Sequence, residues 1–484
     1  MSSTRWNVPR RFLAAVFVFS LDAIIEACLA QSVPPRDPGL RPVIDWSRVG
    51  GLSCTEITKP IPGLTADQEK LFCAGAAEFS KTDNVKDDGL GPTMNFTSCL
   101  GCHQYPSGGG SSPPNKNPQY EFAKSYPPGT NSVPPFVRPD GPIMIARFKK
   151  HPDGSPDGGV HSLFTITGLD GAEGCDLKQE DFQQEIARNN LINRIPTPTL
   201  GAGLIEQIDD LTIEANVKLQ ASRGFGDSQN IYISRGRLNI VQPFHARGGS
   251  ENRSGNDGTI ARFGWKAQNK SLLVFAGEAY NVEIGISNEV FPTEREENSK
   301  CQFHTVPNDI SHPENLFSND PEKRLDALSD VEKFAAFMRF LAPPEPSPDT
   351  PGGESSIRRG SAIFTKIGCA ACHTPELTTS PLSAVAALRN KPVRLFSDLA
   401  LHKMGTKLDD GISQGLAAGD EFRSAPLWGL GHRAYLLHDG RVSDLIKAIE
   451  EHESPGSDAN PVIGLYKALS NTEKQDLLNF LRSL

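Results

Sequence analysis

The residues best suited to chemistry in this sequence are two cysteine–histidine clusters with the same spacing. In each cluster, two cysteines lie three positions apart and a histidine directly follows the second cysteine. Thiols at this spacing can add to the two vinyl groups of a porphyrin, and the adjacent imidazole then serves as the proximal ligand of the iron. The clusters consist of Cys99, Cys102 and His103, and of Cys369, Cys372 and His373.

The segments around the two clusters repeat in the same order. A short helix is predicted before each cluster, at residues 75–79 and 360–364, with glycine at its start and phenylalanine at its end. A helix with a capping box is predicted further along, at residues 328–333 and 469–474. One such cluster by itself could be accidental, or a zinc or dithiol redox site. Two clusters between matching flanks indicate an internal duplication and predict a dihaem protein.

These elements predict a mainly α protein with two cytochrome c-type haem domains. The N-terminal domain, residues 65–341, carries a large insertion at about 105–325 with many loops and short β-like runs, such as residues 162–167 and 231–234. Residues 342–353 contain five prolines and two glycines, which indicates a stiff, extended linker. The C-terminal haem domain then occupies residues 354–484.

The N-terminus has the pattern of a secretory signal peptide, residues 1–30. Arginines precede an apolar run at residues 12–21, and Ala27-Cys28-Leu29-Ala30 offers a cleavage site. The apolar run is too short for a membrane span. A lipoprotein site at Cys28 is the alternative to cleavage after Ala30. The mature chain would begin with a Pro-rich arm at residues 31–64, and we expect it to be periplasmic.

Charge and cysteine content narrow the class further. The net charge of −9 gives no basic surface of the kind that binds nucleic acid. The chain has nine cysteines, of which one lies in the signal peptide and four in the two clusters. The other four predict two disulfides in an oxidising compartment. We expect Cys54 to pair with Cys73 and Cys175 with Cys301, although the sequence does not exclude the other pairings.

Longer stretches of the chain match a known family. They are residues 89–99, 194–206, 258–268, 421–431 and 437–441. On these stretches the chain, from about Leu64 to Leu484, resembles the bacterial dihaem oxidoreductases with peroxidase-like or thiol-oxidoreductase-like character. These proteins are distant relatives of the dihaem cytochrome c peroxidases. The resemblance implies two covalently bound haem c groups.

The resemblance also implies where the second ligand of the C-terminal haem lies. In relatives this ligand follows a His-Asp-Gly segment, here residues 438–440, and His452 lies fourteen positions after His438. Relatives often have methionine there; a histidine would give bis-histidine ligation and a lower potential. Met404 is the competing ligand. No second ligand of the N-terminal haem is evident, which favours an open iron. The available histidines are His151, His161 and His245.

Further roles follow from the resemblance alone. Glu206 is similar to the distal acid of relatives, which would move a proton of bound peroxide, although a salt-bridged surface glutamate is the competing interpretation. Relatives place a tryptophan between their haems, and here Trp265 and Trp428 are the candidates, with core packing as the alternative for each. Arg262 and Arg423 are expected to pair with haem propionates.

The predicted function is that of a periplasmic dihaem peroxidase-like enzyme. Electrons from a small cytochrome c or cupredoxin would pass through the C-terminal haem to the N-terminal haem, which would reduce hydrogen peroxide or another small oxidant. Calcium is possible at the backbone oxygens of Ser424 and Pro426, where the usual threonine of relatives is altered. Two alternatives stay open: a non-catalytic electron-transfer cytochrome, and a dihaem oxygenase resembling rubber oxygenase.

Overall fold

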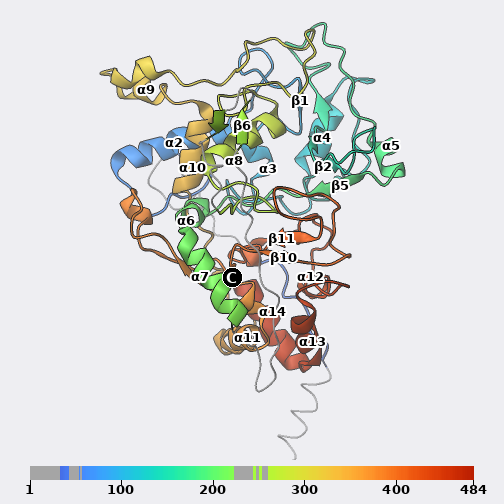
Figure 1. Ribbon diagram of the computed structural model, residues 1–484, viewed down its shortest axis with the longest axis vertical. Coiled ribbons are helices and arrows are strands. Elements are labelled where there is room, and N and C mark those ends of the chain that lie inside the picture. The colour runs from blue at the N-terminus through green and yellow to red at the C-terminus, as the bar shows by residue number, and fades with distance from the viewer. Residues whose placement is uncertain (1–32, 43–53, 55–56, 223–243, 247–249, 253–259) are drawn as a thin grey trace, which may run out of the picture.

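The computed structural model describes residues 33–42, 54, 57–222, 244–246, 250–252 and 260–484 (Figure 1). The predicted signal peptide and the β-like run at residues 231–234 lie outside the described residues. Within the described part of the chain, no helix is both long and apolar enough to cross a bilayer. The chain is 33% helical with few strands, which confirms the mainly α part of the predicted fold class.

The upper half of the molecule is built on two packed helices, α2 (Ala66–Ser80) and α10 (Asp330–Phe340). A capping box starts each helix. Gly75 lies where they cross, because a β-carbon there would collide with the Lys333 carbonyl group and with Phe337. One turn later, the rings of Phe79 and Phe337 lie 4.7 Å apart.

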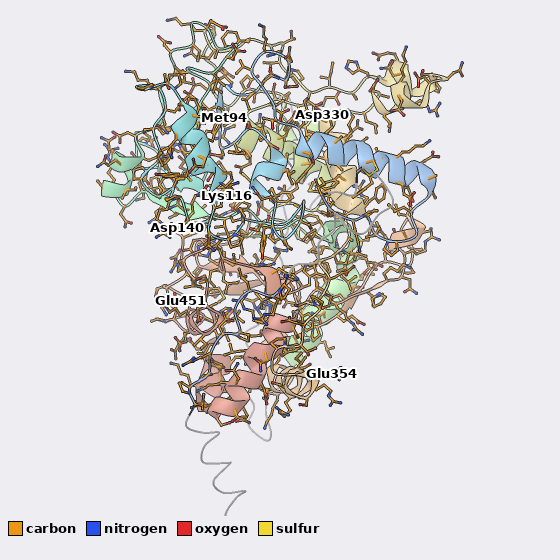
Figure 2. All side chains as sticks on the ribbon, turned by 180° about the vertical axis from the view of Figure 1, so that it is seen from behind. Met94, Lys116, Asp140, Asp330, Glu354 and Glu451 are labelled. Carbon is orange, nitrogen blue, oxygen red and sulfur yellow. A yellow bond between two sulfur atoms is a disulfide. The ribbon has the colours of Figure 1, made fainter. Side chains whose placement is uncertain are left out.

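The lower half repeats this pair with α11 (Glu354–Lys366) and α14 (Asn471–Ser483). A β-carbon at Gly360 would collide with the Asp476 carbonyl group and with Phe480, and the rings of Phe364 and Phe480 lie 5.5 Å apart. Seen from behind (Figure 2), the α10 and α11 N-termini, marked by Asp330 and Glu354, lie in different halves. The predicted flanking helices are therefore confirmed, and their matching contacts agree with an internal duplication.

The other helical elements follow in chain order. Within residues 65–341 they are α3 (Cys99–Cys102), α4 (Pro118–Ser125), α5 (Phe182–Ala187), α6 (Ala202–Glu206), α7 (Asp210–Ser222), α8 (Leu272–Ala279), the π-helix η2 (Tyr280–Ile284), η3 (Pro313–Phe317) and α9 (Pro321–Leu325). Within residues 354–484 they are η4 (Cys369–Ala371), η5 (Ala386–Leu388), η6 (Leu430–His432), α12 (Leu445–Glu450) and α13 (Asn460–Ala468). Helix α7 reaches down into the lower half (Figure 1).

Strands occur as small antiparallel sheets. The only described sheet of three strands has the order β3–β2–β5. The strands are β1 (Thr93–Met94), β2 (Ile145–Phe148), β3 (Val160–His161), β4 (Phe164–Thr165), β5 (Leu191–Arg194), β6 (Phe244–Ala246), β7 (Ser250–Asn252), β8 (Leu377–Thr378), β9 (Pro392–Val393), β10 (Leu401–Lys403) and β11 (Glu421–Arg423). Strand β4 falls within the predicted run at residues 162–167.

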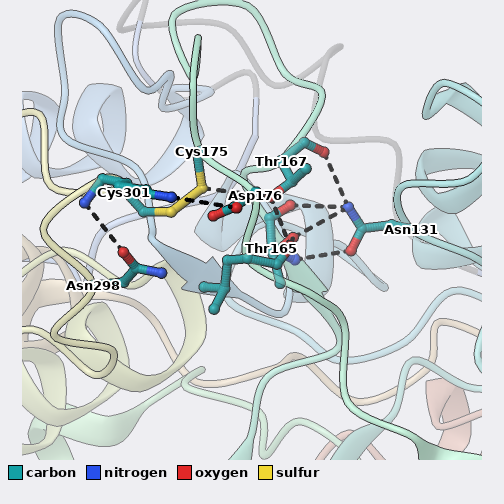
Figure 3. The surroundings of a disulfide bond; sticks show 9 residues. Asn131, Thr165, Thr167, Cys175, Asp176, Asn298 and Cys301 are labelled. Carbon is teal, nitrogen blue, oxygen red and sulfur yellow. Dashed lines mark hydrogen bonds and ion pairs between the residues drawn. A yellow bond between two sulfur atoms is a disulfide. The ribbon is translucent and has the colours of Figure 1, made fainter.

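Both expected disulfides are present, between Cys54 and Cys73 and between Cys175 and Cys301. Figure 3 shows the second one, with the Thr167 hydroxyl group 3.4 Å from the Cys175 sulfur. The Cys301 amide donates a hydrogen bond of 2.8 Å to the Asn298 carbonyl oxygen. The two disulfides close loops of very different length, with sequence separations of 19 and 126 residues.

This difference in loop length predicts an order of stabilities. A disulfide restricts the unfolded chain more when it closes a longer loop, by about 5 kcal/mol for the Cys175 pair and about 3 kcal/mol for the Cys54 pair. We therefore expect the double Cys→Ser variant at Cys175 and Cys301 to lose more free energy of unfolding than the double variant at Cys54 and Cys73. Urea titration of the two double variants measures this loss. An equal or reversed order would contradict the prediction.

Candidate functional site

The first cysteine–histidine cluster lines a cavity in the upper half. The single turn of α3 places Cys99 and Cys102 at one wall, and both thiols are free. The His103 side chain follows at the end of this turn. Most of the lining is apolar and aromatic, with side chains such as Phe79 and Phe275, as suits a planar apolar group.

The imidazole of His103 is oriented as a metal ligand requires. Its Nδ1 lies 3.0 Å from the carbonyl oxygen of Gly110, so Nδ1 carries the hydrogen and donates it there. The other nitrogen, Nε2, then keeps its lone pair for a metal. Burial also lowers the pKa of His103, which favours the neutral ring.

The second cluster lines a larger cavity in the lower half. Cys369 and Cys372 again have free thiols. The Nδ1 atom of His373 lies 3.2 Å from the carbonyl oxygen of Phe396, which repeats the arrangement at His103. The pKa of His373 is lowered to about 4, mainly by burial and secondly by the nearby His452.

His452 is a second histidine in the lining of this lower cavity. It lies just after α12, beside Glu451, which Figure 2 labels in the lower half. Its Nδ1 is 2.7 Å from the carbonyl oxygen of Ala448, so Nε2 is again the free nitrogen. Met404 also lines the cavity. The sequence-predicted ligand and its competitor are thus both placed here, and the imidazole orientation favours His452.

Buried arginines supply a further test of whether haem fits. Arg423 lines the lower cavity, and its Nε atom is buried without a hydrogen-bond partner in the described part of the chain. Arg147 lines the upper cavity with its Nε in the same situation. A propionate could pair with either guanidinium group. Arg433 also lines the lower cavity, and burial lowers its pKa to about 10. No local pattern marks Arg147 or Arg433 in the sequence.

Arg262 requires a correction. Its guanidinium group forms an ion pair with Asp210 and donates to the carbonyl oxygen of Ile208. The side chain is 1% exposed and does not line the upper or the lower cavity. Because its charge is already balanced by a carboxylate, Arg262 is a structural residue rather than a propionate partner.

The two tryptophan candidates occupy different places. Trp265 lines both the upper and the lower cavity, and its indole N–H donates a hydrogen bond of 2.8 Å to the Ile195 carbonyl oxygen. Trp428 lines neither of them; it packs closely against Gly201. The structure therefore brings Trp265, and not Trp428, between the two candidate haem sites.

Glu206 also requires a correction. Its carboxylate accepts hydrogen bonds from Arg339, with Nε at 2.7 Å, and from the amide of Leu272 at 2.8 Å. It caps the start of α8 in this way and does not line the upper cavity. The ion pair with Arg339 corresponds to the salt-bridged alternative for this residue.

Two other glutamates, Glu278 and Glu283, line the upper cavity instead. Glu283 belongs to the π-helix η2, a type of irregularity that is frequent at functional sites. The Asn95 side chain donates a hydrogen bond of 2.7 Å to its carboxylate. Burial raises the pKa of Glu283 above its usual value of 4.5, although Asn95 opposes the rise. The π-helix has no signature in the sequence that would have identified Glu283.

Two of the histidines considered for the upper iron lie away from the upper cavity. His151 and His161 both approach Asp157, at 3.4 and 2.9 Å, and are absent from the cavity lining. The side chain of His245 is outside the described residues. Met338, on α10, does line the cavity.

Calcium at the backbone oxygens of Ser424 and Pro426 stays a prediction. The Ser424 carbonyl oxygen already accepts a hydrogen bond of 2.7 Å from the Ser397 hydroxyl group. No group of three or more histidine, cysteine, aspartate or glutamate side chains suited to a metal ion occurs among the described residues.

Comparison with known proteins gives one family match. A family model described as "Di-haem oxidoreductase, putative peroxidase" matches residues 156–484. No curated protein matches. Among solved structures, Kuenenia stuttgartiensis hydrazine synthase is 22% identical over 34% of this chain and 56% of its own, with a TM-score of 0.21. A MauG-like protein associated with microbial copper homeostasis is 18% identical over 60% of this chain and 93% of its own, with a TM-score of 0.26.

Proposed function

Since the chain belongs to the di-haem oxidoreductase family, we propose that it is a periplasmic peroxidase-like enzyme that reduces hydrogen peroxide with electrons from a small cytochrome c or cupredoxin. Residues 65–341 would hold one haem c and residues 354–484 the other. Bound haem would supply the iron centres that exchange electrons, with the C-terminal one receiving them and the N-terminal one reactive.

The observation that carries this proposal is the difference between the two cavities. Four histidines line the lower cavity, and two of them, His373 and His452, have Nδ1 engaged by a backbone carbonyl group, so that Nε2 is left for a metal. Among the described residues that line the upper cavity, His103 is the one histidine. A buried carboxylate, Glu283, lies in the same lining. A centre with two imidazole ligands suits electron transfer, whereas a centre with one suits reaction with a small oxidant.

In this proposal Glu283 handles the proton. A carboxylate in the upper cavity can accept a proton from peroxide and return it to the leaving oxygen. Asn95 fixes the orientation of the carboxylate, because its own side-chain oxygen accepts a hydrogen bond of 2.8 Å from the Leu163 amide. The Glu283 side chain is thereby held in one position, and the nearby positive charges of Arg147 and Arg295 favour its carboxylate form.

Trp265 is the residue that we propose for electron passage between the sites. Its indole ring lines both cavities. The acceptor of its N–H group is a neutral carbonyl oxygen, that of Ile195, which does not take up the proton. The ring would therefore stay protonated if it were transiently oxidised.

One observation favours the second candidate function, an electron-transfer cytochrome. The thioether side chain of Met338 lines the upper cavity, and methionine is a known haem ligand. If Met338 ligated the N-terminal iron, both centres would be closed and peroxide would not react.

Electron paramagnetic resonance (EPR) of the oxidised, fully loaded protein separates the two functions. We expect one high-spin and one low-spin ferric signal, together with peroxide turnover when a reduced donor is supplied. A pyridine haemochrome assay that gives two haems per chain is the control for loading. Two low-spin signals that persist after partial reduction, without turnover, would assign the protein to the electron-transfer class.

A further inference from the structure

A tight turn from the upper half is inserted into the lower half of the molecule. Phe263 and Asn269 pair across its base, and residues 264–267 form its tip. Ala267 at the tip is fully buried and packs with Leu401 and Ala417, which belong to the lower half. The same tip carries Trp265, so the position of this ring depends on how the tip is held.

Lys266, beside Trp265, is fully buried in this contact. Its ammonium group donates to three backbone carbonyl oxygens of one loop. Those of Ala418 and Gly419 are 2.8 and 2.7 Å away, and that of Glu421 is 3.1 Å away. The carboxylate of Asp410 lies at 3.2 Å. Several carbonyl oxygens and one carboxylate around a single point are the donor set that proteins use for hard metal cations.

The surroundings of this ammonium group connect both cavities. Asp410 also forms a buried ion pair of 2.6 Å with Arg194, which lines the upper cavity. On the other side, the ammonium nitrogen lies 3.9 Å from the centre of the Phe422 ring. That ring stacks at 4.3 Å on His438, and both line the lower cavity. Burial lowers the pKa of Lys266 to about 8, so the group is still mostly protonated at neutral pH.

We propose that Lys266 is a built-in cation that takes the place of a metal ion between the two halves and positions Trp265 between the two cavities. Its four oxygen partners fix the tip of the turn against residues 410–421. The amide of Arg423 donates a hydrogen bond of 2.9 Å to the Trp265 carbonyl oxygen, and the Trp265 indole N–H donates to the Ile195 carbonyl oxygen. The Trp265 ring is thus attached to both halves, and no calcium is required at this interface.

The inference rests on the proposed electron passage through Trp265, so the test measures electron transfer between the haems and not peroxide turnover. The variant is Lys266→Met, which keeps the length of the side chain and removes its charge. Lys218→Met is the matched control, because Lys218 is exposed and forms its ion pair with Glu214 four residues earlier on α7. In a stopped-flow experiment, the C-terminal haem is reduced first, and the absorbance of the N-terminal haem then reports the rate of electron transfer between the two haems.

We expect Lys266→Met to slow this transfer by on the order of tenfold or more, because a small displacement of a positioned group has effects of this size. The haem content and the ligand-field spectra of both haems should be unchanged, as should the rate in Lys218→Met. A rate in Lys266→Met within about twofold of the original would overturn the proposal.

A second measurement needs no variant and covers the case in which Lys266→Met does not yield loaded protein. The calcium content of the original protein is first determined by mass spectrometry. The protein is then dialysed against EGTA, and the rate of electron transfer is measured again. We expect less than stoichiometric calcium and an unchanged rate of transfer. One equivalent of calcium whose removal slows the transfer would overturn the proposal. If the protein does not reduce peroxide at all, both measurements remain decisive for Lys266.

Discussion

Replacing His452 with methionine is expected to raise the reduction potential of the C-terminal haem by on the order of 0.1 V, since a thioether ligand favours ferrous iron more than an imidazole does. His452 lines the lower cavity with its Nε2 free, because Nδ1 donates to Ala448. His373 lines the same cavity, so the two rings face one enclosed space. Spectroelectrochemical titration of the loaded protein measures the shift.

Removing the side chain gives a complementary result. In His452→Ala the low-spin ferric signal should be lost from the EPR spectrum, while the signal of the N-terminal haem stays unchanged. The matched control is Met404→Leu, since Met404 lines the same cavity and is the competing ligand. If Met404→Leu abolishes the low-spin signal and His452→Ala leaves it intact, the ligand is Met404.

Substituting Glu283 with glutamine is expected to lower kcat/KM for peroxide by about 10²–10⁴-fold, the usual contribution of a positioned acid or base. Glutamine has nearly the same shape and can still accept the hydrogen bond from Asn95. It cannot accept a proton from peroxide. Stopped-flow assays with a reduced donor at saturating concentration measure this loss.

The raised pKa of Glu283 also predicts in which direction turnover changes with pH. Burial raises the pKa of Glu283 above 4.5, and the active form in our proposal is the carboxylate. Turnover should therefore fall as the pH drops through this raised pKa, and the acid limb of the profile should lie above pH 4.5. In Glu283→Gln this limb should disappear, because the titrating group has been removed.

Glu206→Gln is the matched control for Glu283→Gln. Glu206 pairs with Arg339 and caps α8 outside the cavity. Its substitution should reduce the free energy of unfolding by about 1–3 kcal/mol through the weakened charged hydrogen bonds. Turnover in the folded fraction should stay within a few-fold of the original. A large loss of turnover in Glu206→Gln with none in Glu283→Gln would restore the sequence-based assignment of Glu206.

The sequence by itself determined the features that depend on neighbouring residues. Two thiols and an imidazole within five positions need a single turn of backbone to reach one wall of a cavity, as α3 and η4 provide. The capping boxes at Ser329 and Ser470 are equally local, since each involves residues three positions apart. These signals predicted the clusters, their flanking helices and the repeat.

Only the tertiary structure decided which distant side chains complete the two sites. Glu206 and Glu283 are both glutamates near the core, but the π-helix η2 directs Glu283 to the upper cavity while Arg339 holds Glu206 outside it. Trp265 and Trp428 differ in the same way, because the inserted turn carries only Trp265 to both cavities. Which glutamate and which tryptophan reach a cavity depends on how segments far apart in the chain pack, and on which charges are already paired within the fold. The spacing of neighbouring residues in the sequence contains neither kind of information.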